Sequence, residues 1–215
     1  SLDFSMFQFS CYKFSKFKLS AFVGRKRGRS RFYFFNQTIA NAVFDAIMPF
    51  LTEEDHWLLL YITGIGLMIW KGGRTGRYTA FTLLITVAVS DQLNSEILKD
   101  YFDRVRPCKA LDDVRLLVSC GSGESFPSSH AVNNFAAATI ASFFYSKYKW
   151  LFFSVASLVA FTRVYVGVHY PVDIITGAIV GMIIGIIILF IINKFYNKDE
   201  SSNDTISDVD DPVGS

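Results

Sequence analysis

The chain has 215 residues, of which 51% are hydrophobic and only 19% are charged. Its length suits one domain and is too short for two well-packed ones. Because soluble domains carry about a quarter charged residues, this composition argues against a soluble protein and indicates a membrane protein. The net charge of +2 gives no indication of a nucleic-acid partner.

Charge is unevenly distributed along the chain. Basic residues cluster within residues 1–31, whereas residues 199–215 are acidic and almost free of bulky side chains. Such polar, charged ends cannot bury enough apolar surface to fold alone. We therefore expect three parts: a basic, poorly ordered segment over 1–31, a membrane-embedded domain over 32–198, and an acidic disordered tail over 199–215.

Five apolar segments approach the roughly 20 residues that a helix needs to cross a bilayer core. They cover residues 57–70, 78–98, 130–145, 150–168 and 171–195. The segment 32–51 is apolar but is interrupted by polar residues and by Pro49, which favours an interfacial helix. A sixth span is the alternative. The fold class predicted is all-α, a polytopic membrane helix bundle of five transmembrane helices, or six.

Lysine and arginine recur in the connections that share one side of this bundle. They lie in residues 71–77 and 147–149 and after residue 193. Cytoplasmic loops are the ones enriched in these residues, so we expect the loop 99–128 and the turn 164–172 to face away from the cytoplasm. The basic residues 25–31 oppose this orientation unless 32–51 crosses the membrane or the stretch is not native to the mature protein.

Ionisable residues near membrane depth indicate function by default, because burying them is costly. Those of most interest converge on the outer side, since the spans alternate in direction: Lys99, Arg106, His130, Arg163, His169 and Asp173. Three cations together favour an anion such as a phosphoryl group. A helix that begins after residues 126–130 (FPSSH) adds backbone N–H groups for a phosphate.

The two histidines and the carboxylate suggest a reaction as well as binding. One histidine can attack phosphorus while the other protonates the leaving oxygen. Asp173 follows His169 by four residues, and its carboxylate is placed to hold the imidazole in one tautomer.

Three motifs then resemble the signatures of the type 2 phosphatidic acid phosphatase (PAP2) superfamily. They are residues 99–107 (KDYFDRVRP), 127–130 (PSSH) and 162–173 (TRVYVGVHYPVD). Ser129 stands where the family usually has glycine, and Thr162 where it has serine. The resemblance covers residues 32–195.

The resemblance implies a role for each residue. Lys99, Arg106 and Arg163 bind phosphate oxygens, aided by Ser128 and the backbone of Ser129. His169 is the nucleophile that becomes phosphorylated, Asp173 orients it, and His130 is the general acid that later activates water. It implies no metal or other cofactor, and a location in a bacterial inner membrane with the site facing the periplasm or exterior.

The implied substrate is a lipid phosphate or diphosphate, with undecaprenyl diphosphate favoured over phosphatidylglycerophosphate, phosphatidate and lipid A. Two other classes stay open. One is a vanadate-dependent haloperoxidase, which uses a related pocket but is soluble; the other is a non-catalytic anion-binding membrane protein, which would need only the cations.

Two further features concern the scaffold. Cys108 and Cys120 bracket eleven residues of the outer loop, where a disulfide would stiffen the link between Arg106 and His130. Glycines recur every fourth residue at 177, 181 and 185, a spacing that allows close helix packing in membranes.

Overall fold

The computed structural model describes residues 25–207, and the side chains of residues 28–194. Within this part the chain is helical and contains no strand. The elements are α2 (Arg25–Tyr33), η1 (Phe34–Thr38), α3 (Ala42–Thr52), α4 (Glu54–Lys71), α5 (Gly73–Leu93), η2 (Asn94–Leu98), α6 (Lys99–Phe102), α7 (Pro107–Ala110), α8 (Ser129–Phe144), η3 (Ser146–Tyr148), α9 (Lys149–Tyr165) and α10 (Pro171–Ser207).

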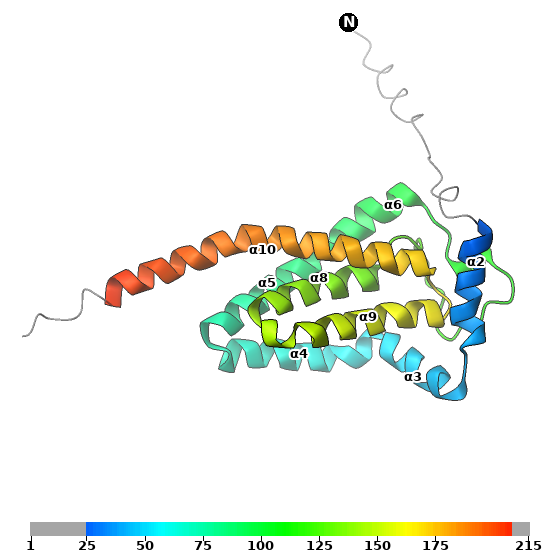
Figure 1. Cartoon of the computed structure of the whole chain (residues 1–215), viewed down its shortest axis with the longest axis horizontal. Coiled ribbons are helices and arrows are strands. Elements are labelled where there is room, and N and C mark those ends of the chain that lie inside the picture. The colour runs from blue at the N-terminus through cyan, green and yellow to red at the C-terminus, as the bar shows by residue number, and fades with distance from the viewer. Residues whose placement is uncertain (1–24, 208–215) are drawn as a thin grey trace, which may run out of the picture.

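The five longest helices, α4, α5, α8, α9 and α10, lie alongside one another and form the bundle (Figure 1). Each overlaps one of the predicted spans, although α5 begins and ends five residues before the predicted segment 78–98. The all-α fold is thus confirmed for the described residues. One segment among them, Pro171–Lys194 in α10, is both long and apolar enough to cross a bilayer by itself.

Glycines allow α10 to approach α8 closely. A methyl group added at Gly181 would lie 2.2 Å from the Val132 carbonyl oxygen, and one at Gly185 would lie 2.8 Å from Cβ of Thr139. Gly177 faces the same helix, with Cβ of Ala131 at 2.8 Å. The predicted close-packing face therefore exists, and it fixes the start of α10 against the start of α8.

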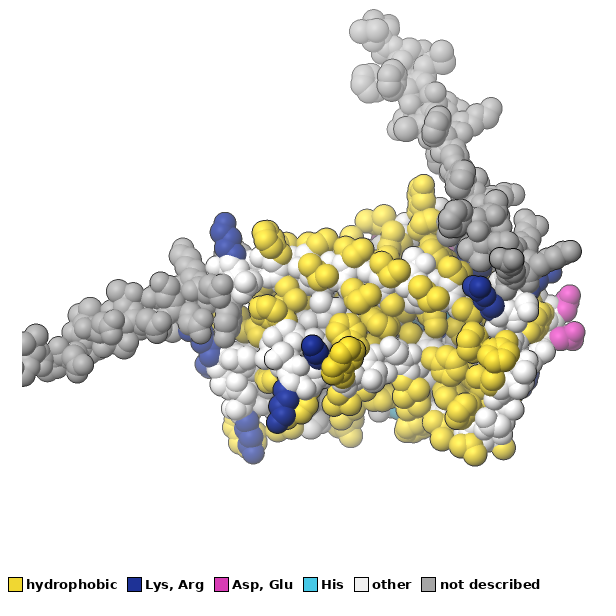
Figure 2. Space-filling model, viewed as in Figure 1, with side chains coloured by type: hydrophobic (Ala, Val, Ile, Leu, Met, Phe, Trp, Pro, Cys, Tyr) yellow, Lys and Arg dark blue, Asp and Glu magenta, His cyan; other side chains and the backbone are white. Residues whose placement is uncertain are grey.

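The outside of the bundle is apolar over much of its surface (Figure 2). Leu59 of α4, Ile186 of α10 and Phe190 of α10 are more than half exposed. Dark-blue lysine and arginine side chains gather at the end of the bundle opposite α2 (Figure 2). Such an apolar wall between polar ends is typical of a protein surrounded by lipid.

Residues 32–51 do not form one continuous helix. Residues 39–41 separate η1 from α3, and the Asn41 side chain caps α3 by accepting a hydrogen bond from the Phe44 N–H. With 11 residues, α3 is about 16 Å long, too short to cross a bilayer. Figure 1 shows α2 running across the end of the bundle rather than along it.

Both ends of the described chain are more helical than predicted. Residues 25–31 belong to α2, which ends at Tyr33 and is attached to the bundle by Phe32, which is fully buried against Tyr170. The helix α10 continues to Ser207 and so includes the first part of the expected tail. Residues 1–24 and 208–215 lie outside the described residues.

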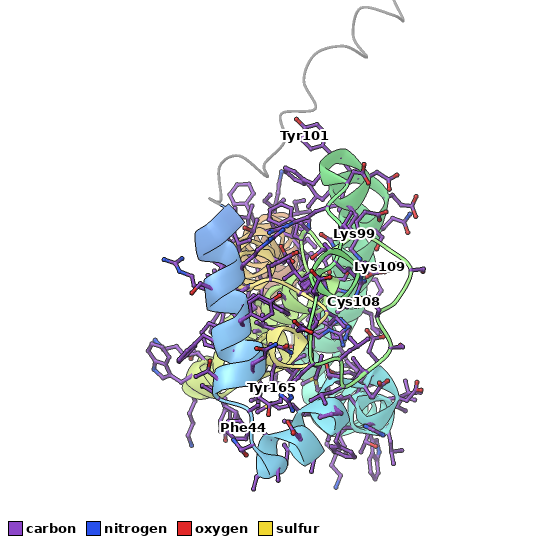
Figure 3. All side chains as sticks on the ribbon, turned by 90° about the vertical axis from the view of Figure 1, so that its right-hand side faces the viewer. Phe44, Lys99, Tyr101, Cys108, Lys109 and Tyr165 are labelled. Atoms are coloured by element: carbon purple, nitrogen blue, oxygen red, sulfur yellow. A yellow bond between two sulfur atoms is a disulfide. The ribbon has the colours of Figure 1, made fainter. Side chains whose placement is uncertain are left out.

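The loop 103–128 covers the same end of the bundle as α2. Cys108 and Cys120 form a disulfide with their Cα atoms 6.1 Å apart. Asn36 donates hydrogen bonds to the carbonyl oxygens of Arg115 and Tyr165, both at 2.8 Å. Viewed from this end, Lys99, Cys108 and Lys109 are seen on the same side of the bundle (Figure 3). The loop is thereby attached to both the N-terminal helices and α9.

Candidate active site

Most of the predicted site residues come from helix ends that meet beneath the loop 103–128, and Arg106 and Ser128 belong to the loop itself. Lys99 opens α6, His130 lies in the first turn of α8, Arg163 in the last turn of α9, and Asp173 in the first turn of α10. His169 stands in the turn between α9 and α10. Alternating helix directions therefore bring together residues that are far apart in sequence.

His169 is held in one orientation by the backbone. Its side chain is only 2% exposed, and Nδ1 lies 2.7 Å from the carbonyl oxygen of Ser125. Because a carbonyl oxygen can only accept, this hydrogen bond requires the proton on Nδ1. The lone pair is then on Nε2, which is the arrangement a nucleophilic imidazole needs.

Asp173 is a fully buried carboxylate at the centre of a hydrogen-bond network. Its Oδ1 lies 2.6 Å from Nη1 of Arg104. Its Oδ2 accepts from the Ser125 hydroxyl and from the Tyr170 N–H, and lies 3.6 Å from Nδ1 of His169. The carboxylate thus supports the imidazole by charge and holds the residues on both sides of it.

Burial lowers the pKa of His169 below its ordinary range, although the nearby carboxylate of Asp173 acts in the opposite direction. Arg163 and Arg106 lower it further by charge repulsion. The imidazole is therefore neutral near pH 7, as a nucleophile must be.

Three cations surround the histidine pair. Lys99, Arg106 and Arg163 lie within electrostatic range of one another. Arg163 acts on both histidines, Lys99 on His130 and Arg106 on His169. The Arg106 side chain donates to the Gly123 carbonyl oxygen, and Arg163 donates to the Thr52 hydroxyl. Burial and the neighbouring Arg106 lower the pKa of Lys99. Like charges this close repel, and a bound phosphate would relieve the repulsion.

His130 faces an open cavity of about 290 Å³. Nε2 of His130 lies 3.2 Å from Oε1 of the exposed Glu54 but is not aligned for a hydrogen bond. The cavity is lined by Thr52, Glu53, Glu54, Asp55, Val118, Ser119, His130 and Arg163. His130 and Arg163 can therefore both reach a molecule that enters from the surface.

The two serines of residues 127–130 have different surroundings. The Ser128 hydroxyl is buried without a hydrogen-bond partner among the described residues, and the Ser128 N–H donates to the backbone oxygen of Asp173. The Ser129 hydroxyl accepts from the Asn94 side chain at 2.9 Å. The unpaired hydroxyl of Ser128 and the first N–H groups of α8 are the donors that suit a phosphate here.

The structure brings all the predicted residues to one end of the bundle, and it adds four that the sequence reasoning missed: Arg104, Ser125, Thr52 and Glu54. Arg104 lies inside the first motif, two residues before Arg106. This position was the only feature of the sequence that could have indicated a role for it. Asp91, another ionisable residue near membrane depth, accepts a hydrogen bond from Asn133 and joins α5 to α8.

Known proteins resemble this chain in the region that carries the site. The PAP2 superfamily matches residues 77–197. The lipid A 4′-phosphatase of Porphyromonas gingivalis is 29% identical over 146 residues, 65% of this chain but 62% of that protein. The undecaprenyl-diphosphatase BcrC of Bacillus subtilis is 33% identical over 136 residues, 63% of this chain and 68% of that protein.

A solved structure has the same fold. The crystal structure of a transmembrane PAP2 type phosphatidylglycerolphosphate phosphatase from Bacillus subtilis matches with a TM-score of 0.62 and 25% identity, over 79% of this chain and 86% of that one. This similarity supports a membrane location for the helical bundle. The chain spans less than two thirds of the length of the lipid A phosphatase.

Proposed function

Because the chain belongs to the PAP2 superfamily, we propose that it is an integral membrane phosphatase that acts on a lipid phosphate or diphosphate through a phosphohistidine. The observation that carries this proposal is the hydrogen bond between Nδ1 of His169 and the Ser125 carbonyl oxygen. It leaves the Nε2 lone pair for attack, at the end of the bundle that also carries three cations and a second histidine.

In the first step, Nε2 of His169 attacks the phosphorus atom and the bond from phosphorus to the leaving oxygen breaks. His130 donates a proton to that oxygen. A lipid alcohol therefore leaves without charge, and a lipid phosphate leaves with one negative charge fewer than it would carry without this proton. Lys99, Arg106 and Arg163 stabilise the charge on the phosphoryl oxygens. The Asp173 carboxylate stabilises the cationic phosphoimidazole.

In the second step, His130 is neutral and takes a proton from water as the water oxygen attacks phosphorus. The bond from phosphorus to Nε2 then breaks, and inorganic phosphate leaves. Each histidine returns to its starting state, so the cycle consumes one water per phosphate released. His130 acts as an acid in the first step and as a base in the second, because the second step reverses the first with water in place of the leaving group.

Undecaprenyl diphosphate is the favoured substrate, as a relative at 33% identity is named for it. Lipid A, phosphatidylglycerophosphate and phosphatidate are the alternatives, and the first two appear in the names of other similar proteins. The apolar bundle surface beside the polar cavity suits all these amphiphiles. A charged head would enter the cavity from the bilayer surface while the chains stay in lipid.

The site is proposed to face away from the cytoplasm. Support comes from the disulfide in the loop 103–128, since disulfides persist in oxidising compartments, and from the basic connections at the other end. In a Cys11→Ser background, a cysteine at Ser122 should react with an impermeant maleimide on intact cells. One at Ser146 should react only after permeabilisation, and the reverse pattern would contradict this orientation.

The function is tested with the purified protein in detergent. Phosphate release from undecaprenyl diphosphate, phosphatidylglycerophosphate, phosphatidate and lipid A is measured in parallel with EDTA present, beside His169→Ala. Release by the wild type and not by the variant supports the proposal, and the ranking of kcat/KM identifies the substrate. Equal release by both proteins, or none from any lipid, would refute it. Activity that requires added vanadate and peroxide would instead indicate a haloperoxidase.

A further inference from the structure

Arg104 contacts the catalytic end of the bundle at three points. Its Nη1 lies 2.6 Å from Oδ1 of Asp173. Its guanidinium stacks over the Tyr170 ring, 4.1 Å from the ring centroid. Its carbonyl oxygen accepts a hydrogen bond of 2.7 Å from the Ser125 N–H. One residue thus binds the turn that carries His169, the carboxylate behind it, and the residue that fixes its tautomer.

The pairing of Arg104 with Asp173 has a clear electrostatic reason. A fully buried carboxylate without a counter-charge is strongly unfavourable. The other hydrogen-bond donors to Asp173 that the structure describes, from Ser125 and Tyr170, are neutral. Among these direct partners, Arg104 is therefore the one that supplies a positive charge to the buried carboxylate.

Arg104 differs in this respect from the arginines assigned to phosphate. Arg106 and Arg163 donate to neutral oxygens, of Gly123 and Thr52, and make no direct ion pair with a carboxylate among the described contacts, although acidic residues lie within electrostatic range of both. The charge of Arg104 is already paired at 2.6 Å and its plane is already stacked. Its geometry is that of a side chain that holds protein groups in place.

We propose that Arg104 is a positioning residue for the phosphoryl-transfer reaction. It holds Asp173 and Ser125 so that Nδ1–H of His169 keeps its acceptor and Nε2 stays aimed at phosphorus. This inference rests on the proposed function, and it assigns Arg104 to the nucleophile rather than to substrate binding.

The charge of Arg104 also governs how readily His169 takes up a proton. The titratable and charged groups that act on the imidazole are Asp173 of α10, Arg163 of α9, His130 of α8 and Arg106 of the loop, and Arg104 is paired with the first of them. Asp173 favours the imidazolium, and Arg104 opposes it by compensating that carboxylate. Removal of Arg104 should therefore raise the pKa of His169. The acid limb of kcat/KM would move to higher pH, because only the neutral imidazole attacks.

The test compares Arg104→Gln and Arg104→Lys in the full chain, with Arg115→Gln as the matched control. Arg115 belongs to the same loop and also pairs with an aspartate, Asp45, at 2.6 Å, but contacts Tyr165 instead of the catalytic turn. For Arg104→Gln we expect kcat to fall about 10- to 100-fold with KM little changed. The acid limb should move up by about one pH unit.

Arg104→Lys keeps the charge and loses the stacked plane, so its acid limb should stay near that of the wild type while kcat is intermediate. Arg115→Gln should lower thermal stability without moving the limb. A raised KM at unchanged kcat for Arg104→Gln would make Arg104 a phosphate ligand and overturn the inference. The inference would also be overturned if the acid limb of Arg104→Gln did not move and its kcat fell no more than that of Arg115→Gln.

Failure of this inference is separable from failure of the proposed function. If the wild type releases phosphate and His169→Ala does not, the function stands whatever Arg104→Gln does. If His169→Ala is as active as the wild type, the function itself fails, and with it the role of Arg104.

Discussion

The carbonyl oxygen of Ser125 takes the hydrogen bond of Nδ1 of His169, although 44 residues separate the two in sequence. The acceptor is a backbone atom that does not titrate, so it holds the tautomer at every pH at which the imidazole is neutral. Asp173, 3.6 Å from the same nitrogen, supplies charge and holds Ser125 in place. The orienting role predicted for Asp173 stays a prediction, and the structure adds the Ser125 carbonyl oxygen as a second group on the same side of the ring.

The position of His169 predicts how activity depends on pH. Only the neutral imidazole attacks, and burial lowers the pKa of this group below its ordinary value of about 6.5. Activity should therefore be retained as pH falls through about 6.5 and be lost only below it. The measurement is kcat/KM against pH for the purified protein, since this quantity reports the free enzyme.

The substrate phosphate also titrates near pH 6, so two substrates are needed as a control. An acid limb that reports His169 keeps its position when a lipid diphosphate is replaced by a lipid monophosphate. A limb that moves with the substrate, or one that lies above pH 7, would contradict this assignment of the limb.

His130 should matter most for substrates with poor leaving groups. A lipid alkoxide needs a proton as it departs, whereas nitrophenolate does not. For His130→Gln we expect a loss of about 10²- to 10⁴-fold on a lipid phosphate and a much smaller loss in the first step with p-nitrophenyl phosphate. Because water attack also needs His130, that variant should release a burst of nitrophenol equal to the enzyme present and then slow down.

Rapid mixing and the amplitude of the burst check this prediction. His169→Gln is the matched variant and should give no burst, since it cannot form the intermediate. If His130→Gln lost activity equally on the lipid phosphate and on p-nitrophenyl phosphate and gave no burst, His130 would take part in neither proton transfer.

The disulfide should stabilise the outer loop. Cys108 and Cys120 are 12 residues apart, and closing a loop of this size is worth about 3 kcal/mol. The double variant Cys108→Ser/Cys120→Ser should therefore have a lower Tm and a lower kcat, because Arg106 lies directly before the bridged segment. The wild type treated with reductant should approach the variant, and the variant should not respond to reductant. A Tm unchanged in both cases would show that the bridge carries no stability.

The motifs in the sequence predict charged residues that the structure brings to one end of the bundle, and they predict little of what holds those residues there. Lys99, His130 and Asp173 lie at the ends of apolar segments, and period and polarity are enough to place such ends together. Arg104 and Ser125 act through one ion pair and one backbone oxygen across the fold. No local pattern encodes such contacts, since they arise only when the loop 103–128 folds over the helix ends.

The interruption of residues 32–51 was partly visible in the sequence. Polar residues and Pro49 argued against a continuous span. The decisive contacts are long-range: the Asn36 side chain binds backbone groups of Arg115 and Tyr165. Buried amides need such partners, and the partners are residues about 80 and 130 positions away, beyond the reach of periodicity.

The last prediction concerns the contact that aligns α10 with α8. At Gly181 an added methyl group would meet the Val132 carbonyl oxygen at 2.2 Å, and neither backbone can move without separating the helices that carry Asp173 and His130. Gly181→Ala should therefore cost about 1–3 kcal/mol and lower the Tm in detergent by about 3–10 °C. Gly64→Ala is the matched control, because a methyl group there has no neighbour within 4 Å and alanine favours the helix. Thermal unfolding of both variants beside the wild type decides the point: equal Tm values for the two would mean that this close approach does not limit the packing of the bundle.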